Sequence, residues 1–249
     1  MVKLPVRLKH DTIIEALFEL RFEPELPSEA VFGAIYPIVT NKFKNLTHTP
    51  LPSSQLPDIV RNSDIQFMYQ PLSRLQEDNL SISIGPRVIN FSIVKPYIGW
   101  DKWKSYILDI LNKLSVGGVI KNVERTGLRY LDFVEQDIFP LINAEFKIID
   151  GTVKPTATTI RTEIPEGEYV KVLQLANCVS INEKGQNKNG SLIDIEVARN
   201  EKIPNDAFKI NLEAMLDKSH IIAKQLFFNI LKEDFLNELG PIYEEISNG

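Results

Sequence analysis

A regular alternation of side-chain character in residues 123–133 constrains the fold of this chain more than any other feature. The segment reads Val-Glu-Arg-Thr-Gly-Leu-Arg-Tyr-Leu-Asp-Phe, and successive side chains of a β-strand point to opposite faces of the sheet. Arg125 and Arg129 are therefore expected on one face, roughly 13 Å apart at about 3.3 Å per residue, with Gly127 between them. The same face should carry Val123, Leu131 and Phe133, and the other face Glu124, Thr126, Leu128, Tyr130 and Asp132.

Residues 12–22 predict a second strand with two distinct faces. One face is wholly apolar, with Ile14, Ala16, Phe18, Leu20 and Phe22. The opposite face is mostly charged, with Glu15, Glu19 and Arg21 beside Leu17. A strand with one apolar and one charged face is typical of an antiparallel sheet that helices cover on one side only.

The remaining elements follow from periodicity and from turn residues. Apolar side chains at helical spacing predict helices over residues 29–43, with a bend or early stop at Pro37, from residue 100 up to Gly117, and over residues 212–239. Strands are expected at 65–72, 80–94 (broken at Gly85-Pro86), 145–149 and 158–164, and as a hairpin of 168–181 and 191–199 around a polar turn at 183–190. The proline-rich stretch 45–63 predicts a loop.

This order of elements predicts an α+β protein. We expect a mostly antiparallel sheet, or two joined sheets, in two related halves with helices packed on one face. A soft boundary near residue 140 separates an N-terminal half, 1–140, that includes the arginine-bearing strand from a C-terminal half, 141–249, of hairpin and long helix. The two halves are expected to form one compact unit.

Charged side chains on these strands are the candidate binding residues. They are Arg125, Arg129, Glu15, Glu19, Arg21 and Glu196, with Asp194 sharing a face with Glu196 and Arg161 sharing a face with Glu163. One interpretation is cross-strand ion pairing on a solvated sheet face. A second places the charges in a cavity, where arginines hold phosphates and carboxylates hold Mg²⁺ or Mn²⁺. A third is an exposed charged groove that receives a protein partner.

Familiar catalytic signatures are missing from the sequence. There is no phosphate-binding glycine loop, and His10, His48 and His220 form no metal-binding pair. We expect His220 to be a half-buried helix residue and Cys178, in an apolar run, to be a buried small side chain. Tyr97, Trp100 and Trp103 could stack on bases, but their helical spacing favours anchoring in the core.

The composition limits the classes of binding partner that we expect for this chain. The formal net charge of −5 gives no overall field that would attract nucleic acid or an anionic membrane. No apolar run approaches the roughly 20 residues of a membrane span, and the first ten residues lack the pattern of a signal peptide. A cytoplasmic protein without cofactor is the resulting expectation, with a protein partner or a second copy of the chain as its binding partner.

Four segments resemble a sporadically distributed prokaryotic protein family of similar length. They are Ile-Glu-Ala-Leu-Phe-Glu-Leu-Arg-Phe at 14–22, Tyr-Ile-Gly-Trp at 97–100, Arg-Thr-Gly-Leu-Arg-Tyr at 125–130 and Leu-Asp-Lys-Ser-His at 216–220. The resemblance covers nearly the whole chain. It implies carriage on mobile or accessory loci, such as defence or toxin–antitoxin islands, and it supplies no catalytic residues.

The strand charges are also similar in type to those of the triphosphate-tunnel (CYTH-like) enzymes, which use a divalent metal to cleave triphosphates. The spacing departs from that family, whose opening motif places glutamates two apart before a lysine. Here Glu15 and Glu19 are four apart and Arg21 follows. We therefore expect a non-catalytic binding or accessory protein that acts through a macromolecular partner. The alternative is a metal-dependent phosphoryl hydrolase that uses the strand-borne Glu and Arg residues.

Overall fold

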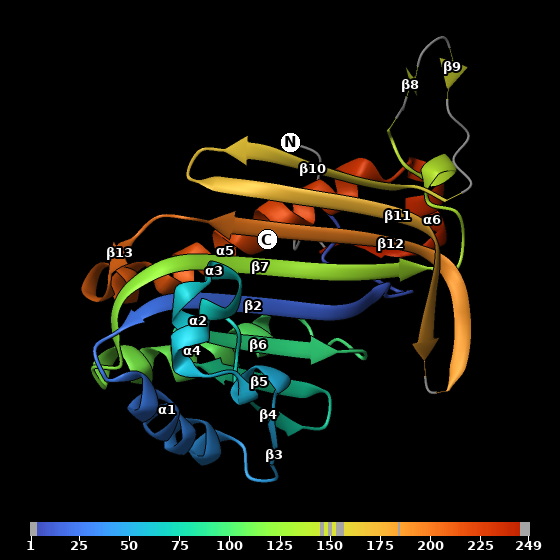
Figure 1. Cartoon of the computed structure of the whole chain (residues 1–249). Coiled ribbons are helices and arrows are strands. Elements are labelled where there is room, and N and C mark those ends of the chain that lie inside the picture. Colours follow the sequence, from blue (N-terminus) through green and yellow to red (C-terminus); the bar gives the residue numbers. More distant parts are fainter. Residues whose placement is uncertain (1–3, 145–146, 149–150, 153–156, 184, 245–249) are drawn as a thin grey trace, which may run out of the picture.

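One large antiparallel sheet organises the protein (Figure 1). The computed structural model describes residues 4–144, 147–148, 151–152, 157–183 and 185–244. At the centre of the sheet, β2 (Ile13–Pro24) pairs with β7 (Ile120–Val134) from Ile13 opposite Asp132 to Pro24 opposite Ile120. The two strands with the clearest alternation in the sequence are thus direct neighbours.

The other strands extend this pair in both directions, and every pairing between described strands is antiparallel. The order is β10 (Thr159–Glu166), β11 (Tyr169–Glu183), β12 (Gln186–Arg199), β7, β2, β6 (Val88–Val94), β5 (Leu80–Gly85), β4 (Ser73–Glu77) and β3 (Thr47–Pro50), while β13 (Ile203–Pro204) also pairs with β7. Two small sheets stand apart: β1 (Arg7–Leu8) with β14 (Pro241–Ile242), and β8 (Lys147–Ile148) with β9 (Gly151–Thr152). The α+β class with a mostly antiparallel sheet is confirmed.

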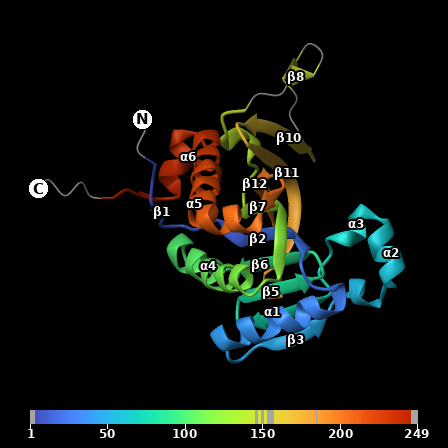
Figure 2. The same ribbon diagram turned by 90° about the vertical axis from the view of Figure 1, so that its left-hand side faces the viewer.

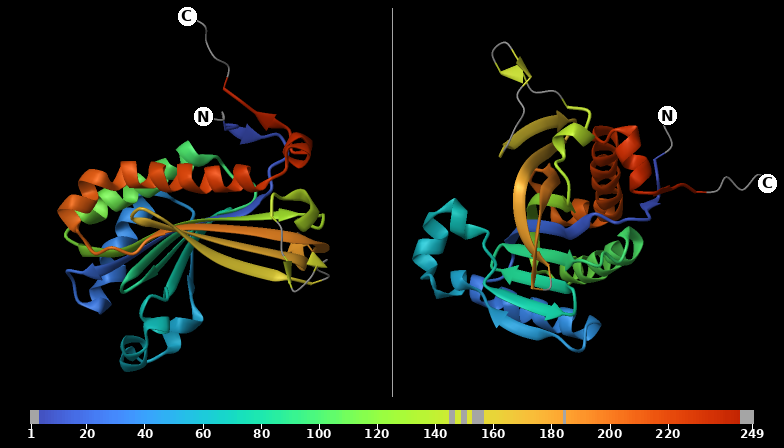
Figure 3. Two further views of the ribbon diagram at one scale, coloured as in Figure 1. Left: turned by 90° about the horizontal axis from the view of Figure 1, so that it is seen from above. Right: turned by 90° about the vertical axis from the view of Figure 1, so that its right-hand side faces the viewer.

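Three long helices cover one face of the sheet. They are α1 (Ser28–Lys42), α4 (Trp100–Val116) and α5 (Asn205–Ile230), of which α5 packs on β7 and β12. The short α6 (Glu233–Glu238) follows α5, and 3₁₀ turns lie at Pro52–Gln55 and Phe139–Leu141. Figures 2 and 3 show α4 and α5 on one side of the sheet, and α2 (Asp58–Ser63) and α3 (Ile65–Met68) on the other.

The core fills the space between the sheet and these helices. Its largest fully buried side chains include Trp103, Phe22, Phe91 and Phe208. The apolar face of β2 supplies Ala16, Phe18, Leu20 and Phe22, all buried, as the alternation predicts. Full burial of side chains of this size contributes about 1.5–3 kcal/mol each, so the covered face holds the layers together.

The soft boundary near residue 140 does not interrupt the sheet. β12 from the C-terminal half pairs with β7 from the N-terminal half along nine consecutive positions, from Ser191 opposite Val134 to Arg199 opposite Thr126. Both halves therefore contribute to one sheet. None of the helices in the described ranges has the length and apolarity that crossing a membrane requires.

Several local predictions are wrong. Residues 65–72 do not form a strand, because Asp64 caps the N-terminus of α3 by accepting a hydrogen bond from the Gln66 amide. Stretch 45–63 contains β3, a 3₁₀ turn and α2 rather than loop alone. Pro37 does not stop α1, which continues to Lys42.

The closing helix is also shorter and earlier than expected. It begins at Asn205 and ends at Ile230, where Leu231 is extended and forms a bridge with Ile142. The Lys232 amide donates to the Leu141 carbonyl, so tertiary pairing replaces the next helical turn. Because the apolar pattern continues through α6, the sequence does not predict this break between the two helices.

The C-terminal hairpin has longer strands than its polar sequence suggests. β11 and β12 continue to Glu183 and Gln186, and the side chains of Asn182 and Asn187 hydrogen-bond across the strands at 3.0 Å. Cys178 lies at a register shift between β11 and β12, with a φ of 55°, and it is exposed rather than buried. Of the strand expected at 145–149, the described residues include only β8.

Candidate functional site

The six predicted binding residues all lie on the face of the sheet opposite α4 and α5. They come from three neighbouring strands: Glu15, Glu19 and Arg21 from β2, Arg125 and Arg129 from β7, and Glu196 from β12. Register places Glu19 opposite Gly127 and Glu196 opposite Arg129. The sequence thus predicted correctly which side chains share a face.

Arg125 joins the three strands by ion pairs. Its Nη1 lies 2.6 Å from Glu19 Oε1 and its Nη2 lies 2.7 Å from Glu196 Oε1. Burial opposes the charge of Arg125, but the carboxylates of Glu196 and Glu19 outweigh burial and raise the arginine pKa. A Cβ on Gly127 would lie only 2.7 Å from Arg125 Nη1. The absence of a side chain at Gly127 therefore makes space for the Arg125 guanidinium over the strand.

The other charges on this face are paired as well. Arg129 Nε donates to Asp194 Oδ1 at 2.7 Å, and this hydrogen bond raises the pKa of Arg129. Arg21 Nε donates to Glu19 at 2.7 Å, and Ser92 Oγ donates to Glu15 at 2.5 Å. These contacts form a ladder of alternating charges across the sheet, so the arginines already have carboxylate partners.

A β-bulge changes one of the expected faces of β7. Arg21 lies opposite Arg125 but Phe22 lies opposite Val123, which leaves Glu124 unmatched. Val123 is consequently fully buried in the core and not on the arginine face. Glu124 instead accepts hydrogen bonds from Arg87 Nη2 and from the Tyr69 hydroxyl.

The described residues contain no group of three or more His, Cys, Asp and Glu side chains arranged to hold a metal ion. The carboxylates of the ladder face guanidinium groups, and hard cations such as Mg²⁺ need several oxygen ligands. The ladder therefore offers no ready magnesium or manganese site.

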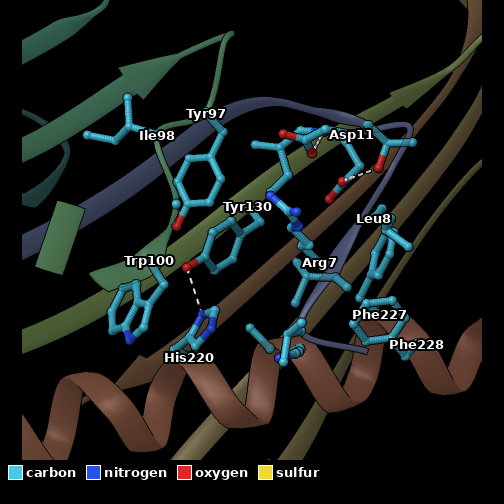
Figure 4. Close-up of a pocket in the computed structure, with 18 residues that line it drawn as sticks. Arg7, Leu8, Asp11, Tyr97, Ile98, Trp100, Tyr130, His220, Phe227 and Phe228 are labelled. Carbon is cyan, nitrogen blue, oxygen red and sulfur yellow. Dashed lines mark hydrogen bonds between the residues drawn. The ribbon is translucent and has the colours of Figure 1, made fainter. Parts of the chain in front are cut away.

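A pocket of about 410 Å³ lies on the opposite side of the same strands (Figure 4). It is enclosed by β1, the start of β2, the β6–α4 connection, β7 and the middle of α5. Labelled lining residues are Arg7, Leu8, Asp11, Tyr97, Ile98, Trp100, Tyr130, His220, Phe227 and Phe228. Its volume lies within the roughly 300–1,000 Å³ of small-molecule sites, and its walls are mostly aromatic and aliphatic.

Trp100 and His220 form one wall of this pocket. Their rings stack with centroids 4.4 Å apart and an interplanar angle of 8°. The Trp100 indole nitrogen donates to Asp217 Oδ1 at 2.9 Å, and the Lys104 ammonium lies 3.0 Å from the same carboxylate. Contacts between α4 and α5 thus fix the position of the wall.

The histidine is linked to the sheet through a tyrosine. The Tyr130 hydroxyl and His220 Nδ1 are 2.9 Å apart. Burial lowers the pKa of His220 to about 4, with a further contribution from the Lys224 charge. At neutral pH the imidazole is therefore uncharged, and Nδ1 can accept a hydrogen bond from the Tyr130 hydroxyl.

Asp132 is the most unusual group in the pocket. It lies on the face of β7 that the helices cover, it is only 3% exposed, and its Oδ1 accepts a hydrogen bond from the Thr12 hydroxyl at 2.7 Å. Burial, with a smaller contribution from the Asp11 and Asp194 charges, raises its pKa to about 7, although the Thr12 hydrogen bond acts in the opposite sense. The carboxyl group is therefore close to half protonated at neutral pH.

Two cationic side chains also line the pocket. Lys224 is partly buried, and burial lowers its pKa although the charge of Glu244 acts in the opposite sense. Within the described residues neither Lys224 nor Arg7 has an ion-pair partner within 4 Å. Figure 4 shows the Arg7 side chain reaching from the first strand toward the interior of the pocket.

Sequence reasoning found only parts of this pocket. His220 is half-buried on α5 and Trp103 is fully buried, as expected, but Trp100 and Tyr97 are only partly buried and line the pocket. The signal that could have drawn attention was Asp132, an acid that follows Leu128 and Tyr130 on one face of a central strand. Its neighbours come from segments far apart in the chain, so no spacing connects them.

Comparisons with known proteins assign no family. No protein-family model matches the chain, and no curated protein matches its sequence.

Proposed function

We propose that this is a non-catalytic binding protein that holds a small organic ligand in the pocket beneath α5 and acts through a macromolecular partner. The observation that carries the proposal is the pocket itself, a cavity of about 410 Å³ with aromatic walls and few polar groups. Sites with this composition favour an apolar ligand body and fix its orientation through a few polar contacts.

The arrangement of the polar groups supports binding rather than catalysis. Nucleophilic catalysis needs a nucleophile, a base and an orienting group in one chain of hydrogen bonds. Here Asp132 accepts from Thr12 and His220 pairs with Tyr130. In the described part of the chain no hydrogen bond connects the acid to the histidine, so the groups form two separate pairs.

The charged ladder supports the same proposal by its pairing. A phosphoryl hydrolase needs guanidinium groups that are available to phosphate and carboxylates that are available to a metal. The two outer nitrogens of Arg125 contact Glu19 and Glu196, and Arg129 contacts Asp194 through two nitrogens. We therefore assign the ladder a structural role.

A macromolecular partner is supported by the short helices α2 and α3. They bury no residue, and Ile59 and Ile65 are 79% and 72% exposed. Exposed apolar side chains gathered on one projection are common at protein–protein contacts. Figure 3 shows this projection on the side of the sheet away from α4 and α5.

The proposal is tested by filling the pocket. Ala223 is 2% exposed and lines the cavity on α5, whereas Ala214 on the same helix faces solvent. Thermal shift is measured with 2-naphthoate, 2-naphthyl phosphate and 2-naphthamide, since a ligand at about 100 times its Kd adds about 2.7 kcal/mol of stability. We expect Ala223→Phe to abolish the shift and Ala214→Phe to retain it.

Each probe is tested at about 1 mM, a concentration at which binding with a free energy of about −4 kcal/mol is detectable. The proposal is contradicted if none of the three probes produces a shift. An unchanged shift in Ala223→Phe contradicts it as well. If Ala223→Phe does not fold, binding of each probe is followed instead through the change in tryptophan fluorescence of the unmodified protein, in which Trp100 lines the pocket.

A further inference from the structure

We infer that the ligand of this pocket is a planar organic anion, with its apolar body between the aromatic walls and its acidic group beside Lys224 and Arg7. This inference rests on the proposed function, since it specifies the ligand of the same pocket. It draws on the charges that face the cavity, which the proposal of binding alone does not use.

The first step of the argument is the position of Lys224. It lies one helical turn beyond His220 on α5, and both side chains line the cavity. Burial lowers the pKa of its ammonium although the charge of Glu244 acts in the opposite sense, and among the described residues no carboxylate forms an ion pair with it within 4 Å. A cation held without a close counter-ion against apolar walls is stabilised when an anion binds next to it.

The second step is the contribution of Arg7. It lines the cavity from β1 at a solvent-exposed position, and β1 is held by backbone pairing of Arg7 with Ile242 and of Leu8 with Pro241. No described carboxylate lies within ion-pair distance of its guanidinium. A guanidinium presents two parallel donors that suit a carboxylate or a phosphate. By contrast, Arg125 on the opposite side of the sheet has two carboxylate partners.

The third step is the state of the other titratable groups that face the cavity. His220 is neutral, because its pKa is lowered to about 4 by burial. Asp132 is partly protonated, because burial raises its pKa to about 7, and burial also raises the pKa of Asp11. The two acids therefore repel a bound anion less than two fully ionised carboxylates would, and protonated Asp132 can donate a hydrogen bond to it.

The shape and composition of the walls argue for a planar body. Trp100 and His220 stack as one flat unit, while Tyr97 and Tyr130 stand at right angles to each other, with ring centroids 6.1 Å apart. Phe227 adds a further aromatic surface from α5. Rings in these orientations contact a flat ligand through faces and edges.

Affinities of three matched probes test the inference. 2-Naphthoate, 2-naphthyl phosphate and 2-naphthamide share one body and differ in the head group, so calorimetric titration isolates the effect of charge. We expect at least one anion to bind about tenfold more tightly than the amide, because hydrogen bonds to charged groups are stronger than neutral ones. The tighter anion identifies the head group as a carboxylate or a phosphate.

Two lysine variants on α5 locate the effect. Lys224→Met should reduce the affinity of the preferred anion about tenfold and leave that of 2-naphthamide unchanged. Lys209→Met, at an exposed position of the same helix, should change neither affinity. Arg7→Gln provides a second variant that should weaken the anion only.

The outcomes separate this inference from the proposed function. If the amide binds as tightly as both anions, or if Lys224→Met and Arg7→Gln bind the anions as well as the unmodified protein does, the inference is wrong and the pocket remains a binding site. If no probe binds, the proposed function itself is contradicted.

Discussion

Arg125 and Arg129 on one face of β7 lie within a few residues of Tyr130 and Asp132 on the other face, yet the two pairs have different surroundings. The arginine face is exposed to solvent at its edges, and its charges contact opposite charges on adjacent strands at 2.6–2.7 Å. The pocket face is covered by α5, and its Asp132 is buried with one hydroxyl partner. We therefore propose a structural role for the first face, whose charges are paired, and a ligand site at the second, whose groups are weakly paired.

The comparison can be tested most strongly at Asp132. The folded-state pKa of about 7 lies above the usual 3.8, so the folded protein retains a proton between about pH 4 and 7 that the unfolded chain loses. The stability due to this group is therefore complete below pH 4 and decreases by about 1.4 kcal/mol per pH unit up to pH 7. Asp132→Asn should be more stable than the unmodified protein at pH 8, by about 4 kcal/mol.

Urea denaturation at pH 4 and pH 8 measures this difference. Asparagine keeps an oxygen that can accept the Thr12 hydrogen bond, so the variant removes the ionisation and not the contact. An equal stability difference at the two pH values would show that Asp132 is not a buried, readily protonated acid.

His220 should show the opposite pH dependence. Burial lowers its pKa to about 4 from 6.5, so the unfolded chain takes up a proton between those pH values while the folded protein does not. Its contribution is present above pH 6.5 and is lost on acidification toward pH 4, about 3 kcal/mol in all. Between pH 6.5 and pH 4, His220→Gln should therefore gain about 3 kcal/mol of stability relative to the unmodified protein, as followed by urea titrations at half-unit pH steps.

Between about pH 4 and 6.5, the contributions of Asp132 and His220 to the free energy of unfolding change with pH in opposite directions, so they offset each other in the unmodified protein. Each single variant should therefore reveal the slope of the other group. A stability difference between His220→Gln and the unmodified protein that does not change from pH 6.5 to pH 4 would contradict the burial of the neutral imidazole.

Removing a charge from the ladder should cost stability without affecting the pocket. Arg125→Ala leaves Glu19 and Glu196, with side chains 15% and 25% exposed, without their shared partner. We expect a loss of about 2 kcal/mol, less than the 3–5 kcal/mol of a fully buried pair because water reaches these groups. Chemical denaturation measures the loss, and calorimetry should show unchanged affinity for 2-naphthoate.

The smallest effect is expected on the α2–α3 projection. Ile65→Ser changes a side chain that is 72% exposed, so stability should change by less than about 0.5 kcal/mol. A larger loss in thermal denaturation would show that the projection packs against the body of the protein and does not offer Ile65 to a partner.

The difference between the two faces also explains how much the sequence could predict. The ladder depends on period-two alternation within strands and on the pairing of neighbouring strands. The alternation predicts that Arg125 and Arg129 share a face of one strand and that Glu19 and Arg21 share a face of another, whereas the pairing that joins these faces is visible only in the structure. The sequence does not predict the bulge at Glu124, because no glycine or proline marks it and it is visible only in the register with β2.

The pocket could not be predicted in the same way. Thr12, Trp100 and His220 belong to three segments that meet only when β1, α4 and α5 pack together. The pKa shifts of Asp132 and His220 arise from burial, which depends on that packing. Similarly, the end of α5 at Ile230 depends on the bridge between Leu231 and Ile142, a contact between distant segments.

The most direct test of the account is a ¹⁵N NMR titration with 2-naphthoate that follows side-chain N–H signals on both faces of the sheet at once. The Trp100 indole N–H reports on the pocket, and the Nε–H groups of Arg125 and Arg129, hydrogen-bonded to Asn200 and Asp194, report on the ladder. We predict that the Trp100 signal shifts to saturation while both arginine signals stay in place. Movement of the arginine signals with an unchanged Trp100 signal would place the ligand on the ladder and contradict the assignment of the pocket.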